Sequence, residues 1–139
     1  MKISKITIIE WFLRVSISVG FLSAVADRLG FWPKEVSAWS NWESFLAYTK
    51  TLNPLLPSEV IPAIGFTATL LEVVLAVLLL TNFKTSLIAK TSGFLILLFA
   101  LSMTFSINIK TPLDYSVFCA SAAAFALSEI VGIKQKQIN

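Results

Sequence analysis

Four long apolar runs dominate this sequence, each about the length that a helix needs to cross a lipid bilayer. They cover residues 6–26, 60–80, 86–106 and 113–131. A hydrocarbon core about 30 Å thick takes roughly 20 apolar residues in helical form. Short polar joints separate the last three runs, which makes consecutive helices antiparallel neighbours. We therefore predict an all-α integral membrane protein, a four-helix up-down bundle in a single domain over residues 1–139.

The composition supports a lipid environment for these helices. Hydrophobic residues make up 56% of the chain and charged residues 14%, whereas a soluble domain has about 45–50% apolar and about 25% charged residues. The net charge is only +3, and the basic residues form no stripe. Nucleic acid is therefore not an expected partner, because its binding needs a concentrated basic surface.

The inventory of reactive side chains is small. The chain has no histidine and one cysteine, Cys119, which excludes internal disulfides, Cys-x-x-Cys redox pairs and Cys/His zinc sites. No paired nucleophile and base and no glycine-rich phosphate loop stands out. We predict no catalytic residues and no metal site, and we leave open whether the protein is an enzyme, expecting no activity of its own.

The first apolar run has two interpretations. Residues 24–26 read Ala-Val-Ala, a small-x-small pattern that signal peptidases cut. A leader, however, has an uncharged apolar core of about 7–15 residues, and Glu10 and Arg14 interrupt the run from inside. Residues 15–25 alone could still serve as a leader core. We expect a retained membrane helix.

The lysines and arginines favour one orientation, because cytoplasmic loops carry an excess of them. One side of the predicted bundle has Lys2, Lys5, Lys84, Lys134 and Lys136, and the other has Arg28, Lys34, Lys50 and Lys110. The difference is small, but the first helix usually dominates. We predict that both termini are cytoplasmic.

The long connection, residues 27–59, then faces outward. It contains three tryptophans expected at the membrane interface, where an amphipathic indole is favoured: Trp32, Trp39 and Trp42. Ser40 and Glu43 match a capping box that begins a helix, and Asn53-Pro54 would end it. We predict a short interfacial helix on the outer membrane face or across the mouth of the bundle.

Three charged residues at membrane depth form a candidate buried network: Glu10, Arg14 and Glu72. Glu10 and Arg14 are four residues apart and share a helix face. Glu72 lies on a face of small residues that favours packing against another helix, and Arg14 is its expected partner because Lys90 can extend to the interface. The network could only fix the helix register, or it could form a binding or proton-handling site. Glu10 and Arg14 could instead lie shallow.

The last run contains two positions for which we expect structural roles. Asp114 follows Thr111 and Pro112, an arrangement typical of a helix start. Cys119 lies among alanines and serines that repeat every four residues, so we expect a small buried residue in a close-packed face.

Several short segments resemble the DoxX family of small four-helix bacterial membrane proteins. Arg14, Phe21 and Arg28 resemble its opening pattern of an arginine, a phenylalanine seven later and a basic residue fourteen later. The segment around Glu72, followed by Lys84 and Ala89, resembles its second and third helices. "YTKTLNPLLP" and "IKTPLDYSVF" also resemble segments of DoxX-like proteins. The resemblance implies a multi-pass protein of the bacterial cytoplasmic (inner) membrane.

The resemblance also implies candidate functions. Relatives in this family have been linked to thiosulfate:quinone oxidoreduction and to membrane complexes for oxidative stress. We expect a protein that binds a lipid-like ligand, a lipid or a quinone, or that supports a membrane or periplasmic partner complex. The alternative is a quinone-linked subunit of an oxidoreductase whose redox cofactor is on another chain. A third hypothesis is a small transporter with Glu72 as its proton site.

Overall fold

The computed structural model describes residues 4–138, and helices are its only regular elements within this range. Lys2, used above for orientation, lies outside the described residues. Six α-helices and one 3-10 turn follow in chain order: α1 (Lys5–Arg28), α2 (Trp42–Leu52), η1 (Ser58–Val60), α3 (Ile61–Leu79), α4 (Thr85–Ser106), α5 (Lys110–Asp114) and α6 (Val117–Ile138).

Four of these elements are long and apolar enough to cross a membrane. They are Lys5–Arg28, Ser58–Leu79, Thr85–Ser106 and Val117–Gln137. The predicted all-α class with four membrane-compatible helices is therefore confirmed. Pro62 lies in the first turn of α3, where the missing N–H costs no helical hydrogen bond.

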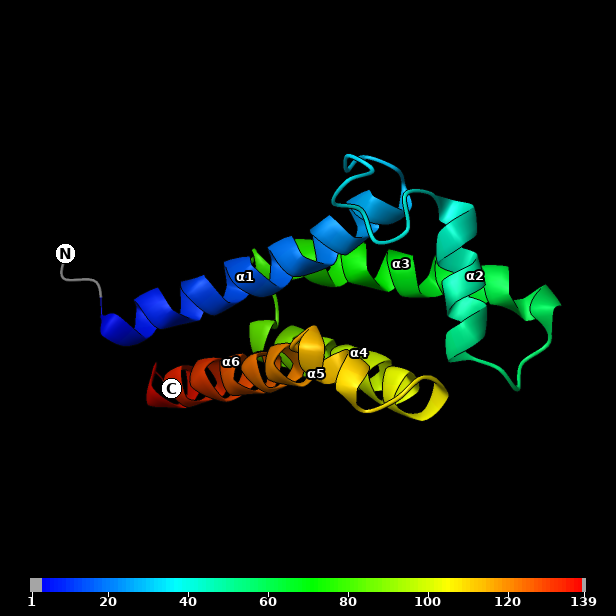
Figure 1. Cartoon of the computed structure of the whole chain (residues 1–139). Helices are drawn as coiled ribbons and strands as arrows, with labels where there is room; N and C mark the ends of the chain where they lie inside the picture. The colour runs from blue at the N-terminus through cyan, green and yellow to red at the C-terminus, as the bar shows by residue number, and fades with distance from the viewer. Residues whose placement is uncertain (1–3, 139) are drawn as a thin grey trace.

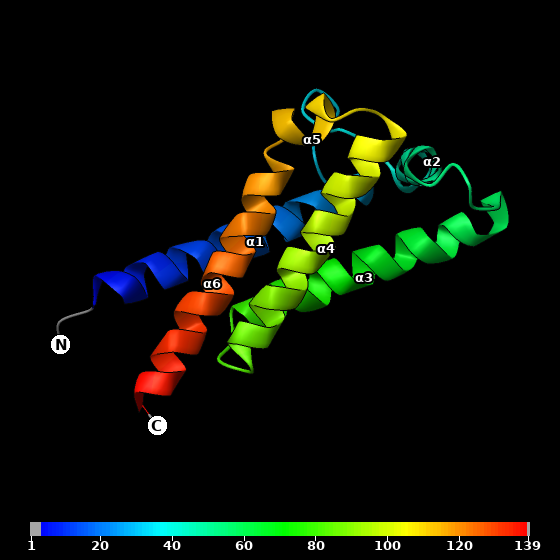
Figure 2. The same cartoon turned by 90° about the horizontal axis from the view of Figure 1, so that it is seen from below.

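The four long helices form two antiparallel pairs (Figure 1). One layer holds α1 and α3, the other holds α4 and α6, and the two pairs cross when the molecule is seen from below (Figure 2). Because α3 also packs on α4, and α6 packs on α1, each long helix contacts the next one along the chain and the last returns to the first. This is the connectivity of an up-down bundle.

The α4–α6 contact is built from small side chains. Its fully buried members include Ala89, Ala100 and Ala124, with Ser92 and Ser128 beside them. Serine hydroxyls bridge the two helices, since Ser121 Oγ donates to the Gly93 carbonyl at 2.9 Å and Ser128 Oγ to the Ser86 carbonyl at 2.8 Å. Small residues allow close backbone approach, and the hydroxyls add polar contacts between helices.

The predicted interfacial helix is α2, which lies across α3 at one end of the bundle (Figure 1). Its N-cap is Asn41, whose side chain accepts from Ser44 N at 2.8 Å. The predicted capping box at Ser40 is wrong by one residue, because Ser40 has a left-handed backbone (φ +66°) while Asn41 has the extended backbone of a cap.

A glycine lets α2 approach the backbone of α3 closely. A Cβ added to Gly65 would lie 2.7 Å from Leu46 Cδ2 and 3.1 Å from Phe45 Cε1. Both distances are shorter than ordinary van der Waals contacts. The position of α2 therefore depends on Gly65 having no side chain.

The last predicted run divides into two helices. Pro112 and Asp114 belong to the short α5, and α6 begins only at Val117 because Ser116 is left-handed (φ +56°). Asp114 forms an exposed ion pair with Lys110 instead of starting the membrane helix. The expectation that Cys119 is buried is also wrong, since its side chain is exposed.

Candidate functional site

A buried ion pair joins the end of α1 to the middle of α3. Arg28, the last residue of α1, is 4% exposed, and Glu72 is 2% exposed. Arg28 Nη2 donates to Glu72 Oε1 at 3.0 Å, and Nη1 donates both to the other carboxylate oxygen and to Thr69 Oγ1, the latter at 2.9 Å. Two parallel hydrogen bonds give this contact a defined geometry as well as charge neutralisation.

Aromatic rings from the outer connection cover the Arg28 head group. Its Cζ lies 4.2 Å from the centroid of the Phe45 ring and 5.3 Å from that of Trp39, both within the range of cation–π attraction. Asp27 holds the covering loop in place by accepting from the Ser37 hydroxyl and from the backbone N–H of Ala38. The loop and α2 thus cover the ion pair from outside.

The expected pairing of Arg14 with Glu72 is wrong. Ser18 Oγ donates to the Ala76 carbonyl at 2.9 Å, and this antiparallel register brings Arg14 level with the end of α3. There Arg14 Nη1 donates to the carbonyls of Leu79, at 3.3 Å, and Thr81, at 2.7 Å. Glu72 lies further along α3, within reach of Arg28.

Arg28 is the residue that the sequence interpretation missed. We ended the first helix at residue 26 and counted Arg28 only as a charge for orientation. Side chains on a helix lean toward its N-terminus, so a terminal arginine extends back along the bundle. Its spacing of fourteen from Arg14 was the available signal, because it places both arginines on nearly the same helix face.

Glu10 and Arg14 belong to a second, separate ionic cluster. Arg14 Nη2 and Glu10 Oε1 are 2.5 Å apart, and Lys134 Nζ lies 2.5 Å from Glu10 Oε2. The predicted Glu10–Arg14 contact is therefore present, with Lys134 of α6 as an additional partner. This cluster ties α1 to α6 and to the α3–α4 turn, which suits a structural role.

A cavity of about 550 Å³ opens beside the Arg28–Glu72 pair. It lies among α1, α2, α3, α4 and the start of α6, and most of its lining is apolar, including Leu52, Ile64, Leu71, Leu95, Leu98 and Phe99. Arg28 and Glu72 are its only charged lining residues among those described. Tyr48 and Ser102 add hydroxyl groups, and burial raises the pKa of Tyr48, so this phenol stays protonated at neutral pH.

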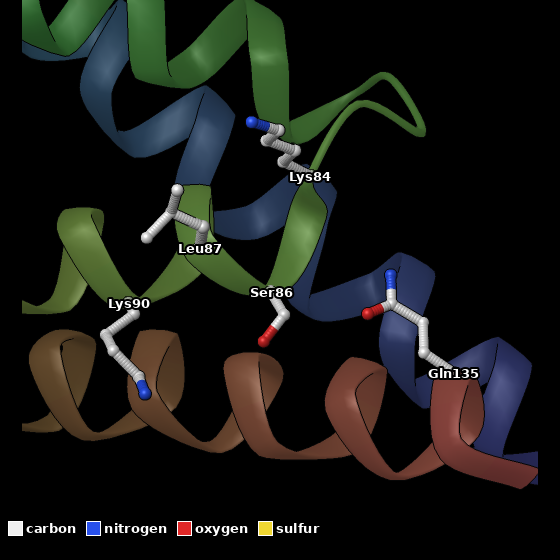
Figure 3. Close-up of a pocket in the computed structure, with 5 residues that line it drawn as sticks. All are labelled: Lys84, Ser86, Leu87, Lys90 and Gln135. Carbon is white, nitrogen blue, oxygen red and sulfur yellow. The ribbon is translucent and has the colours of Figure 1, made fainter.

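A second hollow, of about 460 Å³, lies at the other end of the bundle (Figure 3). It is lined by Lys84, Ser86, Leu87, Lys90 and Gln135. The two lysine side chains point in different directions (Figure 3), and both are exposed. Without a buried polar group facing it, this hollow is a weaker candidate than the apolar cavity.

The three tryptophans predicted at the interface all lie near the outer connection. Trp39 and Trp42 pack on Phe45, with ring centroids 5.5 Å and 5.2 Å apart. Trp32 is more exposed, and its indole N–H donates to the Ser23 carbonyl at 3.2 Å. Trp39 thus lines the candidate site, while the depth of all three in a bilayer stays a prediction.

Comparison with protein-family models, curated proteins and solved structures finds no match for this chain. Family membership and activity therefore stay predictions. Among residues 4–138, no three side chains of the metal-ligating types gather into a group. The cavity with its single ion pair is the candidate site.

Proposed function

We propose that this chain is a small multi-pass membrane protein that holds a lipid-like ligand in the cavity between α2, α3 and α4. The observation that carries the proposal is the cavity itself: about 550 Å³ of mostly apolar space beside one buried Arg28–Glu72 pair. Small-molecule sites typically measure about 300–1,000 Å³ and combine an apolar lining with few polar groups.

The placement of the cavity supports a ligand drawn from the membrane. Its walls come from three membrane-compatible helices and from α2, which crosses one end of the bundle. An apolar molecule already dissolved in the bilayer would lose little by entering such a space. The buried ion pair would then orient the polar end of that molecule.

A volume-filling variant tests the proposal. Ala68 lines the cavity, so Ala68→Phe should occupy part of the space without adding charge. The full chain is purified in mild detergent, and the co-purified molecules are extracted and identified by mass spectrometry. We expect one lipid-like species at near-stoichiometric amount in the wild type, and much less of it in the variant.

Ala120→Phe is the matched control. Ala120 is exposed on α6 and is not part of the cavity wall, so this variant should retain the ligand. If the wild type carries no specific molecule, or if Ala68→Phe retains as much of it as Ala120→Phe, the proposal is wrong.

We further propose that the chain is a DoxX-like protein of the bacterial inner membrane with both termini in the cytoplasm. The resemblance described above and the lysine distribution support this assignment. Cysteine introduced at Lys136, in a Cys119→Ser background, should react with a membrane-impermeant maleimide only after the inner membrane is opened. An isoprenoid quinone as the extracted ligand would favour the quinone-linked subunit over a lipid-binding or partner-supporting protein.

A further inference from the structure

One polar atom at the candidate site has no partner. Arg28 uses both terminal nitrogens on Glu72 and Thr69, but its Nε has no hydrogen-bond acceptor among the described residues. The side chain is 4% exposed and lines the cavity. A buried N–H without an acceptor costs free energy, so an acceptor supplied by a ligand would remove that cost.

The charge at the site is already balanced. Arg28 carries one positive charge and Glu72 one negative charge, and the other described lining residues carry none. An anionic head group would repel Glu72 and leave a net negative charge in an apolar space, and a cationic one would do the opposite. Either is costly at low dielectric, which favours an uncharged ligand.

We propose that the head group of the ligand is an uncharged hydrogen-bond acceptor, such as an ester or ketone oxygen, that accepts from Arg28 Nε. This inference rests on the proposed function and specifies the class of ligand. The apolar lining contacts the body of the molecule, and the hydroxyls of Tyr48 and Ser102 lie in the same wall as further donors. Lipid esters and quinone carbonyls share this chemistry.

Three probes with the same chain length separate the contributions of acceptor and charge. Methyl oleate has a neutral ester, oleate at pH 8 has a carboxylate, and 1-octadecene has no acceptor. Binding to the full chain in nanodiscs is measured by displacement of the co-purified ligand. Because a hydrogen bond from a charged donor is strong, methyl oleate should bind roughly ten- to a hundred-fold more tightly than 1-octadecene. It should also bind more tightly than oleate.

Decylubiquinone and monoolein, compared under the same conditions, distinguish a quinone carbonyl from a lipid ester as the preferred source of the acceptor. Both are uncharged. Tighter binding of either one than of oleate supports the neutral-acceptor class, and the ranking between the two identifies the source.

Arg28→Lys tests the donor itself. Lysine keeps a positive charge opposite Glu72 but has no group at the position of Nε. We expect the advantage of methyl oleate over 1-octadecene to disappear in this variant. Arg14→Lys is the matched control, since Arg14 also has an Nε without an acceptor but lies in the other cluster, outside the cavity wall. It should leave the preference unchanged.

The outcomes separate this inference from the proposed function. If the wild type binds oleate as tightly as methyl oleate, or binds 1-octadecene as tightly, the neutral-acceptor inference is overturned while a lipid-binding function stands. The same holds if Arg28→Lys folds and keeps the full preference for the ester. If no probe binds and no molecule co-purifies, the proposed function fails and this inference fails with it.

Discussion

Removing Glu72 should destabilise the protein more than removing any exposed carboxylate. Glu72→Ala leaves the Arg28 guanidinium buried with Thr69 as its remaining side-chain acceptor. Breaking a buried pair by deleting one partner typically costs about 3–5 kcal/mol, and the attraction of Phe45 and Trp39 offsets about 0.5–2 kcal/mol of that. A net loss of about 2–4 kcal/mol corresponds to a fall in melting temperature of roughly 5–15 °C for a chain of this size.

A double-mutant cycle assigns that loss to the pair. Arg28→Ala should also destabilise, because it leaves the Glu72 carboxylate buried and unpaired. Arg28→Ala/Glu72→Ala removes both charges, so it should be more stable than the sum of the two single losses predicts, by about 0.5–3 kcal/mol. Thermal unfolding in one detergent, followed by circular dichroism and by intrinsic tryptophan fluorescence, provides the four melting temperatures.

Arg14 is the control for this cycle. It is buried like Arg28, but it pairs with Glu10 and with carbonyls at the end of α3. Because Arg14 and Glu72 share no partner, Arg14→Ala and Glu72→Ala should be additive within about 0.5 kcal/mol. Additivity for Arg28 with Glu72, or coupling for Arg14 with Glu72, would refute the assignment of partners.

Three further predictions concern packing and the second cluster. Gly65→Leu should overpack the contact with Leu46, cost about 1–3 kcal/mol and raise hydrogen exchange in α2; unchanged exchange there would show that α2 does not depend on this contact. Lys134→Met removes one of two cations from Glu10 and should lower the melting temperature less than Glu72→Ala does; an equal or larger fall would contradict the secondary role assigned to this ion pair. Cys119→Ser should change stability by no more than about 0.5 kcal/mol, because the thiol is exposed; a large change would mean that the thiol is packed.

The amino-acid sequence by itself determined the class and the elements of this protein. Four apolar runs of bilayer length have one stable form in lipid, because every backbone N–H and C=O must be satisfied within its own helix. The short joints determined that the long helices are antiparallel neighbours. The small residues around Glu72 were sufficient to predict that this carboxylate faces the bundle, where it is now seen at 2% exposure.

Only the tertiary structure decided which charges meet and where the cavity forms. A helix face is readable from spacing, but the axial register of α1 against α3 depends on packing along the whole contact, and it paired Glu72 with Arg28 instead of Arg14. The cavity likewise needs α2 to cross α3 at Gly65, a position fixed by turns at Ser40 and Asn41 and by side-chain fit. Such contacts join residues far apart in sequence, and local periodicity carries no information about them.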